Sequence, residues 1–312
     1  MAGHQNHRKL NAPLRSSNPE DSAQTEGRDW RWTGFRDKTL WNVLELLILP
    51  LSLLIGVWYL NARVSQQQEQ VAQRQVSEQQ QIDQMAIDRA QQDTLDRYID
   101  DMVASLDEGL LTSPANSQQR DLARARTLLT LRSLDNTYKA LLLQFVYEAG
   151  LISESNTVIS LSRAELSGIN LNATFLAQAN LRETLLADSE FLGAKLQGAD
   201  LSVAELSRAG LSDSFLFEAN LSRATLSNAK LQRAILVRAN LSGADLGGAD
   251  LSGAFLVRTN LRGANLRGAN LRNANLNEAN LNSANLDGTD ISQAFLCNTI
   301  MPDGSVENRD CP

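Results

Sequence analysis

The sequence predicts a β-solenoid with four-sided coils, preceded by a transmembrane helix and further α-helical segments. Three observations lead to this prediction. From Leu161 to Leu296 an apolar residue stands at every fifth position, and it is leucine everywhere except at Phe191 and Ile291. Near the N-terminus, residues 40–60 are almost entirely apolar. Between these two regions, apolar residues recur at helical spacing.

The first 60 residues predict a tail followed by a membrane span. Residues 1–38 are polar and lack apolar periodicity, which is typical of a disordered tail. The stretch LWNVLELLILPLSLLIGVWYL, from Leu40 to Leu60, is long enough as a helix to cross a bilayer core of roughly 30 Å. Trp41, Trp58 and Tyr59 fit the aromatic belts at its two ends. We therefore expect a transmembrane helix over 39–60 in the lipid bilayer, with a buried soluble helix as the alternative.

Residues 61–112 predict a long helix that is rich in Gln and charged residues. Five apolar residues share one heptad phase: Val64, Val71, Met85, Ile99 and Leu106. Glu78 and Gln92 occupy the same phase, so a coiled coil and a single solvated helix both stay open. Ser113 and Pro114 are expected to end this helix.

Residues 115–150 predict a helical hairpin that caps the next domain. Its helices are expected over 118–134 and 136–149, with Asp135 as an N-cap and Gly150 as a C-terminal stop. Their apolar faces must be buried. The expected faces comprise Leu122, Leu128, Leu129, Leu131 and Leu134 in the first helix, and Tyr138, Leu141, Leu142, Phe145 and Val146 in the second.

The leucine repeat over 156–300 requires a chain that turns a corner every five residues, because neither the helix period nor the strand period keeps such positions on one face. If each unit forms one side of a square, four units form a coil of 20 residues, and the region forms about seven coils. At the spacing of a β-sheet the stack would be roughly 34 Å tall. Leucines would fill the axis, together with small residues such as Ala199 and Ala204.

The repeat resembles that of the pentapeptide-repeat family, whose consensus is A(D/N)LXX. The resemblance implies a right-handed quadrilateral β-helix. The stretches LWNVLELLILPLSLL, LARARTLLTLRSLD and LLLQFVYEAGLI resemble the N-terminal part of bacterial, notably cyanobacterial, membrane-anchored members. The closing TIMPDGS resembles the C-terminal stop of many members, so 301–312 is expected to be a cap and tail, with Pro302 removing a donor.

Positions 20 apart fall on one face of a square coil, so the residue before each leucine can be sorted by face. One face carries a polar ladder able to hydrogen-bond between coils: Ser160, Asn180, Asp200, Asn220, Asn240, Asn260 and Asn280. Another carries most of the apolar residues. This apolar stripe comprises Phe175, Phe215, Phe217, Ile235, Val237, Phe255, Val257 and Phe295.

An exposed apolar band of this size marks an interface. Three occupants stay open at this point: the helices at 118–149 folded back over the stripe, a second copy of the chain, or a separate protein partner. The first two rank equally and above the third. Either of them would bury large aromatic side chains, each contributing about 1.5 to 3 kcal/mol.

Charge argues against nucleic-acid chemistry. The formal net charge is -7, and residues 156–300 contain 12 Lys and Arg against 13 Asp and Glu. Some members of the family mimic DNA and inhibit or protect topoisomerase through an acidic surface. The nearly neutral repeat disfavours that alternative, and no nucleic-acid partner is expected. Arg262, Arg267 and Arg272 form a candidate anion patch, with a solvated collar as the simpler interpretation.

The sequence offers no catalytic or metal-binding constellation. His4 and His7 lie in the tail, and Cys297 and Cys311 lie near the C-terminus, so we expect neither an enzyme nor a cofactor or metal site. Carboxylates such as Glu165, Glu205 and Asp245 share one face. Because acidic and amide residues are common at that position of the repeat, a structural role is the stronger interpretation.

We therefore expect a non-enzymatic, membrane-anchored scaffold that presents the β-helix for protein–protein interaction or self-association. Four basic residues within 28–38 precede the span, against Arg63 and Arg74 after it. The positive-inside rule then favours a cytoplasmic N-terminus and an extracytoplasmic repeat domain. A disulfide between Cys297 and Cys311 would fit that compartment.

Overall fold

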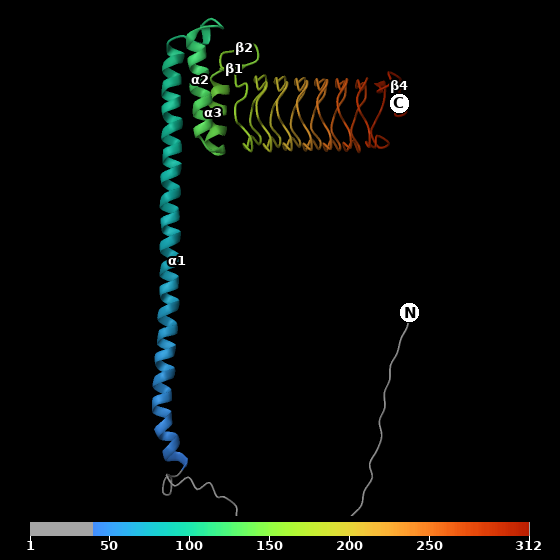
Figure 1. The fold of residues 1–312 in the computed structure, drawn as a ribbon. Coiled ribbons are helices and arrows are strands. Elements are labelled where there is room, and N and C mark those ends of the chain that lie inside the picture. The colour runs from blue at the N-terminus through green and yellow to red at the C-terminus, as the bar shows by residue number, and fades with distance from the viewer. Residues whose placement is uncertain (1–39, 312) are drawn as a thin grey trace, which may run out of the picture. The chain divides into compact units, whose positions relative to one another are not determined.

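The computed structural model describes residues 40–311, with side chains from Leu44 onward, and the tail expected over 1–38 lies outside them (Figure 1). The chain divides into two compact units, 1–77 and 78–312. In chain order its elements are α1, a 3₁₀ turn, α2, α3 and four short strands, two on each side of the leucine repeat.

Helix α1 runs from Leu40 to Asp107 and contains the apolar stretch of the first unit. It is long and apolar enough to cross a membrane. From Leu44 to Ala90 no described side chain is buried, although many are large and apolar. An apolar helix surface that the described residues leave uncovered is unfavourable in water.

The end of α1 differs from the sequence expectation. The helix stops at Asp107, and a separate 3₁₀ turn covers Leu110–Thr112. Gly109 lies between them with a φ of 87°, a left-handed conformation that terminates a helix. The expected continuation of the helix to residue 112 is therefore wrong, because Gly109 ends the helix before Pro114.

Helices α2, Gln118–Ser133, and α3, Asn136–Glu148, form the hairpin. The Asp135 carboxylate accepts hydrogen bonds from the backbone N–H groups of Thr137 and Tyr138, which confirms it as an N-cap. Ser117 caps α2 in the same way through the N–H of Arg120. Gly150 follows α3 with a φ of 69°, as expected for a C-terminal glycine.

The buried faces of the hairpin differ in part from the expected ones. Leu122, Leu129 and Leu141 are exposed. The positions that pack inward instead follow spacings of three and four residues, which place them on one side of each helix. They are Ala123, Thr127, Leu131 and Leu134 in and after α2, and Leu142, Leu143 and Val146 in α3.

The hairpin packs against the last turns of α1 in the second unit. The Tyr98 hydroxyl and the Thr127 hydroxyl lie 2.8 Å apart, and the Tyr98 ring meets Phe145 edge-on. Burial raises the pKa of Tyr98 to about 12, although the Thr127 hydrogen bond opposes this shift. Tyr98 and the repeat leucines belong to one continuous hydrophobic core, and Phe145 packs against it.

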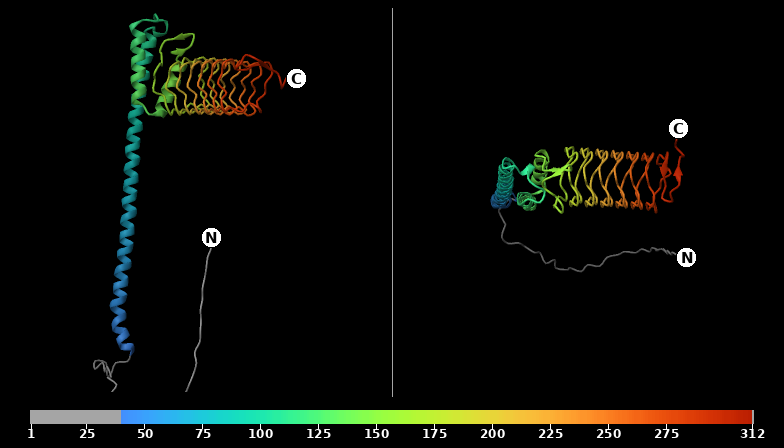
Figure 2. Two further views of the ribbon diagram at one scale, coloured as in Figure 1. Left: turned by 45° about the vertical axis from the view of Figure 1, so that its right-hand side comes forward. Right: turned by 90° about the horizontal axis from the view of Figure 1, so that it is seen from above.

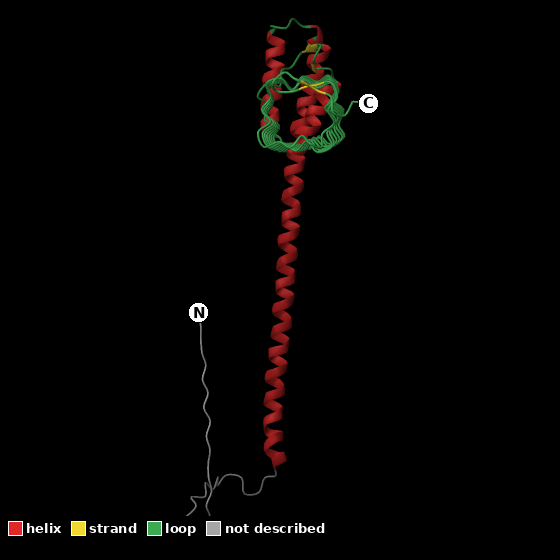
Figure 3. Cartoon of the chain, turned by 90° about the vertical axis from the view of Figure 1, so that its right-hand side faces the viewer, coloured by secondary structure: helices red, strands yellow, loops and turns green. Residues whose placement is uncertain are grey.

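From Glu165 onward, nearly all residues that precede a repeat leucine pair, as parallel β-bridges, with the residue 20 positions later. The hydrogen bonds between coils are regular. The N–H groups of Leu201 and Val203 donate to Asn220 and Ser222 of the next coil, and Asp200 donates back to Ala179. Seen along the stack, successive coils superimpose in one outline (Figure 3), and the side views show them stacked beyond α3 (Figure 2).

Each corner is a tight turn in which the residue three places after a leucine donates its N–H to the leucine carbonyl, as Ala204 does to Leu201. The residue before that donor has a positive φ, 66° at Gly243 and 60° at Arg238. This geometry suits a type II turn, which favours glycine. A non-glycine residue costs about 1 kcal/mol or more in this conformation. The hydrogen bonds and packing between coils must therefore hold the backbone in it.

The interior follows the sequence expectation closely. The repeat leucines and the alanines two places before them are almost all inaccessible to solvent, including Leu246, Ala199 and Ala204. The polar ladder is present on its expected face: Asn220 donates to Asp200, Asn240 to Asn220, and Asn260 to Asn240, at 3.0 to 3.2 Å. Burial along the axis and amide ladders along the outside thus stabilise the same stack.

Short antiparallel strand pairs stand at the two ends of the repeat. Strands β1, Ile152–Ser153, and β2, Asn156–Thr157, precede the first coil. Strands β3, Thr299–Ile300, and β4, Val306–Glu307, follow the last one. A disulfide joins Cys297 to Cys311 and holds the segment after β4 against the final coil.

Candidate interaction surface

Wall four, which we define as the side of the stack that carries Leu176 and every leucine 20 residues further on, holds the apolar stripe. The residues before these leucines form one continuous column of parallel bridges. In order the column comprises Phe175, Lys195, Phe215, Ile235, Phe255, Asn275 and Phe295. The sequence register thus places the stripe residues above one another, on a single wall.

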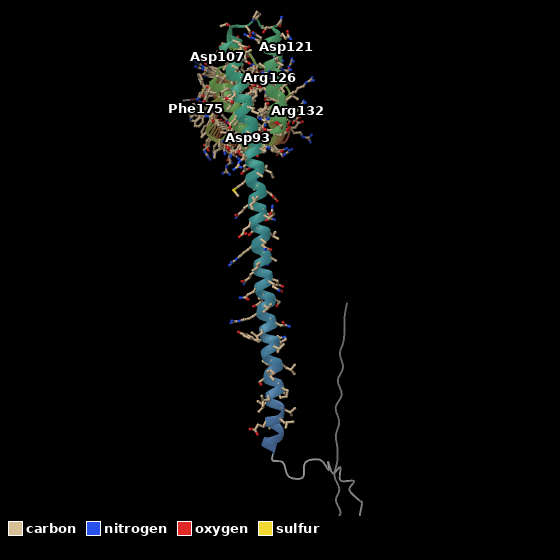
Figure 4. All side chains as sticks on the ribbon, turned by 90° about the vertical axis from the view of Figure 1, so that its left-hand side faces the viewer. Asp93, Asp107, Asp121, Arg126, Arg132 and Phe175 are labelled. Atoms are coloured by element: carbon tan, nitrogen blue, oxygen red, sulfur yellow. A yellow bond between two sulfur atoms is a disulfide. The ribbon has the colours of Figure 1, made fainter. Side chains whose placement is uncertain are left out.

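The stripe is open to solvent in the described chain. Phe175 is 69% exposed, Phe255 47% and Phe295 49%. Figure 4 shows Phe175 at the outer edge of the repeat, pointing away from it. Phe215 and Ile235 are half-buried by their neighbours in the column. Large aromatic rings left uncovered in register form an apolar band rather than scattered surface residues.

A second column runs beside the first, one residue after each leucine of wall four. Phe217 is exposed, and Val237 and Val257 are half-buried next to it. Asn277 follows in the same column, and its side-chain Oδ1 is buried without a hydrogen-bond partner among the described residues. The second column widens the apolar band over the middle of the stack and ends where Asn277 begins.

A third column on wall four is charged. Arg238 Nη1 lies 3.2 Å from the Glu218 carboxylate, and Arg258 Nε lies 2.7 Å from the Glu278 carboxylate. The hydrogen bond from Arg258 lowers the pKa of Glu278 below its usual value, despite some desolvation. Each pair joins consecutive coils on the exposed surface, so each contributes modestly to stability.

Lys195 interrupts the aromatic column but remains part of it. Its Nζ lies 3.1 Å from the centroid of the Phe215 ring, so the ammonium caps the face of the aromatic ring. Arg238 lies 6.0 Å from the Phe217 ring centroid in the neighbouring columns. The sequence register shows that these residues share a wall, but the stacking of a cation on a ring was not evident from it.

The helical hairpin does not cover the stripe. Arg120, Arg124 and Asn136 donate hydrogen bonds to backbone carbonyls of Thr157, Ser160, Ser162 and Gly168, which belong to the start of the repeat. Phe217, Phe255 and Phe295, further along wall four, stay exposed. Of the three occupants left open by the sequence, the helices at 118–149 therefore do not cover the stripe: the apolar faces of the hairpin pack against the end of the core and the last turns of α1.

The candidate anion patch is not gathered at one point. Arg262, Arg267 and Arg272 stand one residue after successive leucines, five residues apart, and hence on three different walls of one coil. All three side chains are exposed. Their backbone N–H groups donate to the Asn residues two positions earlier. Anion binding by these arginines stays a prediction, and the arrangement suits a basic collar rather than a pocket.

The stacked carboxylates are also held apart. In their column Leu185 stands between Glu165 and Glu205, and Thr225 stands between Glu205 and Asp245. The Ser227 hydroxyl, joined by Gly247 N–H and Asn265, lowers the pKa of Asp245 against the effect of burial. Asp245 is therefore a structural acceptor. Among residues 40–311 no group of three or more metal-ligating side chains is present.

The pentapeptide-repeat profile matches residues 164–202, 204–243, 219–256, 239–277 and 264–301, with eight copies of the repeat. HetL, a pentapeptide-repeat protein of Nostoc sp. strain PCC 7120 involved in the regulation of heterocyst differentiation, shares 30% sequence identity. The match covers 53% of this chain and 98% of HetL, with a TM-score of 0.26. The chain belongs to the pentapeptide-repeat family. Membership of this family implies a right-handed quadrilateral β-helix. The parallel bridges and the tight corners of the chain agree with that fold.

Two other solved pentapeptide-repeat proteins are similar to the repeat region. Rfr23 of the cyanobacterium Cyanothece 51142 is 28% identical over 46% of this chain and 91% of its own, with a TM-score of 0.22. A pentapeptide-repeat protein of the Arabidopsis thaliana thylakoid lumen is 28% identical over 35% of this chain and 66% of its own, with a TM-score of 0.17. No protein of curated function matches the chain significantly.

Two exposed apolar residues of this pentapeptide-repeat protein were missed by the sequence register. Leu192 follows Phe191 on the wall next to the stripe, and Val203 occupies a corner with a φ of 61°. The other positions of its column hold Asn, Ser, Gln or Arg, so the departure from this polar pattern is the signal that marks Leu192. Neither residue belongs to a column of apolar neighbours, and both are isolated.

Proposed function

We propose that this protein is a membrane-anchored, non-enzymatic scaffold that presents its β-helix for protein–protein interaction or self-association through wall four. The observation that carries the proposal is the apolar stripe: aromatic and aliphatic side chains are kept in register over the length of the repeat, and the described residues leave them exposed or half-exposed. Removing such a band from water is the main driving force for association.

The apolar stretch of α1 supports the anchoring part of the proposal. Its side chains face outward on all sides between Leu44 and Leu60, with only Gly56 partly covered. A helix that is apolar all round is stable in hydrocarbon and unfavourable in water. The helix then continues with polar sequence over 61–90, where no side chain is buried.

Two observations support an extracytoplasmic repeat domain with a cytoplasmic N-terminus. Four basic residues lie within 28–38, just before the apolar stretch, against Arg63 and Arg74 at a similar distance after it. The Cys297–Cys311 disulfide of the C-terminal cap suits an oxidising compartment. Variants that add one cysteine, at Ser17 or at Ser77, test this orientation in intact cells with a membrane-impermeant maleimide, with the unaltered chain as the background for Cys297 and Cys311. Labelling at Ser77→Cys alone agrees with the proposal, and labelling at Ser17→Cys alone rejects it.

The interaction part is tested by recovering the full chain from a detergent extract of its native membrane and identifying the proteins that accompany it. The test variant is Phe215→Asn with Phe255→Asn. Asn already occupies this column at Asn275 and is frequent at the same repeat position, so the fold should tolerate it. The matched control is Thr225→Asn with Lys230→Asn, at the same repeat position on two other walls.

Loss of accompanying protein, or of self-association, in the stripe variant but not in the control supports the proposed function. Equal recovery with both variants shows that wall four is not the interaction surface. Circular dichroism and protease resistance of both variants report whether the β-helix is intact, so that a loss of binding is not confused with a loss of fold.

A further inference from the structure

We infer that wall four pairs with wall four of a second copy of this chain, antiparallel, about a twofold axis that passes at Ile235. This inference rests on the proposed function and names the partner. It starts from the order of the bridged column: Phe175, Lys195, Phe215, Ile235, Phe255, Asn275 and Phe295. Read from either end, the column gives the same sequence of apolar and polar positions, with Ile235 at its centre.

A column with this symmetry is self-complementary when one copy is inverted. In the antiparallel alignment Ile235 meets Ile235 of the second copy, and Phe215 meets Phe255. The outer rings, Phe175 and Phe295, meet each other as well. The polar positions also coincide, because Lys195 lies opposite Asn275. An isologous interface requires this property, since one patch must fit itself after a twofold rotation.

The parallel alternative is electrostatically worse. With both copies in the same direction and in register, Lys195 faces Lys195 of the second copy inside an apolar band. Two ammonium groups brought together with partial loss of water repel each other and lose solvation. In the antiparallel alignment Lys195 faces the neutral amide of Asn275, which offers an acceptor. Lys195 also keeps its place over the Phe215 ring.

The charged column on the same wall favours the same direction. A twofold axis that lies across the wall maps this column onto itself, so Glu218 faces Arg258 of the second copy and Arg258 faces Glu218. Opposite charges thus meet at both flanks. At the centre, Arg238 faces Arg238 of the second copy. Within each chain this arginine is already paired with Glu218 at 3.2 Å. Complementary charge of this kind fixes the register of an interface.

The contact is long and narrow. Six steps between coils at about 4.8 Å give a length of about 29 Å, over a width of a few residues. Such a surface lies at the lower end of the range for specific protein interfaces. Anchoring both copies in one membrane raises their effective concentration, which allows a contact of this size to form. Pairing is therefore expected for the anchored full chain.

The test uses the full chain in lipid vesicles, co-expressed with two different tags, and mild oxidation of variants that each add one cysteine to the native Cys297–Cys311 pair. Ile235→Cys is expected to form a disulfide with itself, and the apparent mass of the chain then doubles. Phe215→Cys and Phe255→Cys are expected to cross-link when the two are co-expressed and far less when either is expressed alone. Lys230→Cys, at the same repeat position on the neighbouring wall, is the control and should stay monomeric.

Two results overturn the inference. One is cross-linking at wall four that never exceeds the Lys230→Cys control. The other is self-cross-linking of Phe215→Cys and Phe255→Cys that equals that of the mixture, which shows parallel pairing. Peptide mass analysis confirms that Cys297 and Cys311 remain joined to each other in every variant. If cross-linking fails while Phe215→Asn with Phe255→Asn still loses its accompanying protein, the proposed function stands and only the second copy is rejected.

Discussion

Arg124 donates from Nε to the carbonyl oxygen of Ser160 at 3.1 Å, and backbone N–H groups make the equivalent bond in the coils from Asp200 onward. Its Nη2 reaches the carbonyl oxygen of Ser162 at 3.3 Å. These two oxygens are equivalent to those of Asp200 and Ser202, which accept from Leu181 and Glu183 of the preceding coil. Among the described residues, no repeat coil precedes the first one to supply these two backbone N–H donors. The Arg124 guanidinium of α2 takes their place and protects the open edge of the first coil.

Removing this guanidinium should loosen the first coil. Arg124→Met keeps the aliphatic stem but leaves both carbonyls to water, and we expect a loss of about 1 to 3 kcal/mol in the free energy of unfolding. Denaturant titration measures the loss. Amide exchange should quicken at the first coil and not at the middle of the stack. Arg126→Met on the same helix is the control, because Arg126 has only a 3.9 Å exposed ion pair with Asp101.

The body of the repeat was predictable because every unit has the same environment. Leucine at a spacing of five dictates a corner, and the corner dictates that Phe215 lies above Lys195. The ends were harder to predict. The roles of Arg124 and Asp310 depend on how a helix and a tail approach the stack, which no periodicity encodes. The prediction of the buried hairpin faces was wrong in part for a related reason. Leu122 and Leu129 are apolar, but they lie beside the buried row formed by Ala123, Thr127 and Leu131.

The stripe was predictable as a wall but not as a free surface. Grouping positions that are 20 residues apart placed Phe175 and Phe255 on one wall. That they are uncovered in the described chain is seen only in the structure, where the hairpin packs on the first coil. The direction in which two copies pair depends on Lys195 and Asn275, which do not belong to the apolar pattern.

A charge placed in the axis should collapse the repeat. Leu246 has no solvent exposure, and Leu246→Asp would bury a carboxylate without a partner, a cost of several kcal/mol. We expect loss of the β-type circular dichroism spectrum and of protease resistance. Leu192→Asp is the matched control, because Leu192 is exposed and its replacement keeps the axis intact. A folded, protease-resistant Leu246→Asp protein would contradict the description of the axis.

The amide ladder should contribute measurably at its centre. Asn240 donates to Asn220 and accepts from Asn260 and from the N–H of Ser242. Asn240→Ala leaves these partners partly unsatisfied, and we expect the free energy of unfolding to fall by about 1 to 3 kcal/mol. Thr225→Ala serves as the control from the neighbouring wall. A smaller effect for Asn240→Ala than for Thr225→Ala would show that water replaces the ladder without cost.

Reduction of the Cys297–Cys311 disulfide should loosen the C-terminal cap. The two cysteines are 14 residues apart, and closing a loop of this size is worth about 3 kcal/mol. Cys297→Ser with Cys311→Ser should therefore speed amide exchange at Leu296 and Asn298, whose N–H groups are bonded by Asp310 and Asn308. Exchange at Leu241 in the middle of the stack should not change, because that coil is closed by its neighbours. An equal acceleration at both places would show that the cap and the stack unfold together.

Acid should open the same cap through Asp310. Its carboxylate accepts the N–H of Leu296 at 2.9 Å, and this bond, opposed by some desolvation and helped by Arg309, lowers the pKa of Asp310. A carboxyl whose pKa is lower in the folded state stabilises the fold above its unfolded value of about 3.9 and loses that contribution as the pH falls through the folded value. Exchange at Leu296, corrected for its intrinsic pH dependence, should therefore accelerate below about pH 4. Asp310→Asn keeps an acceptor oxygen without the titration, so its exchange should be independent of pH over this range, and an unchanged acid response in that variant would assign the effect to another carboxyl.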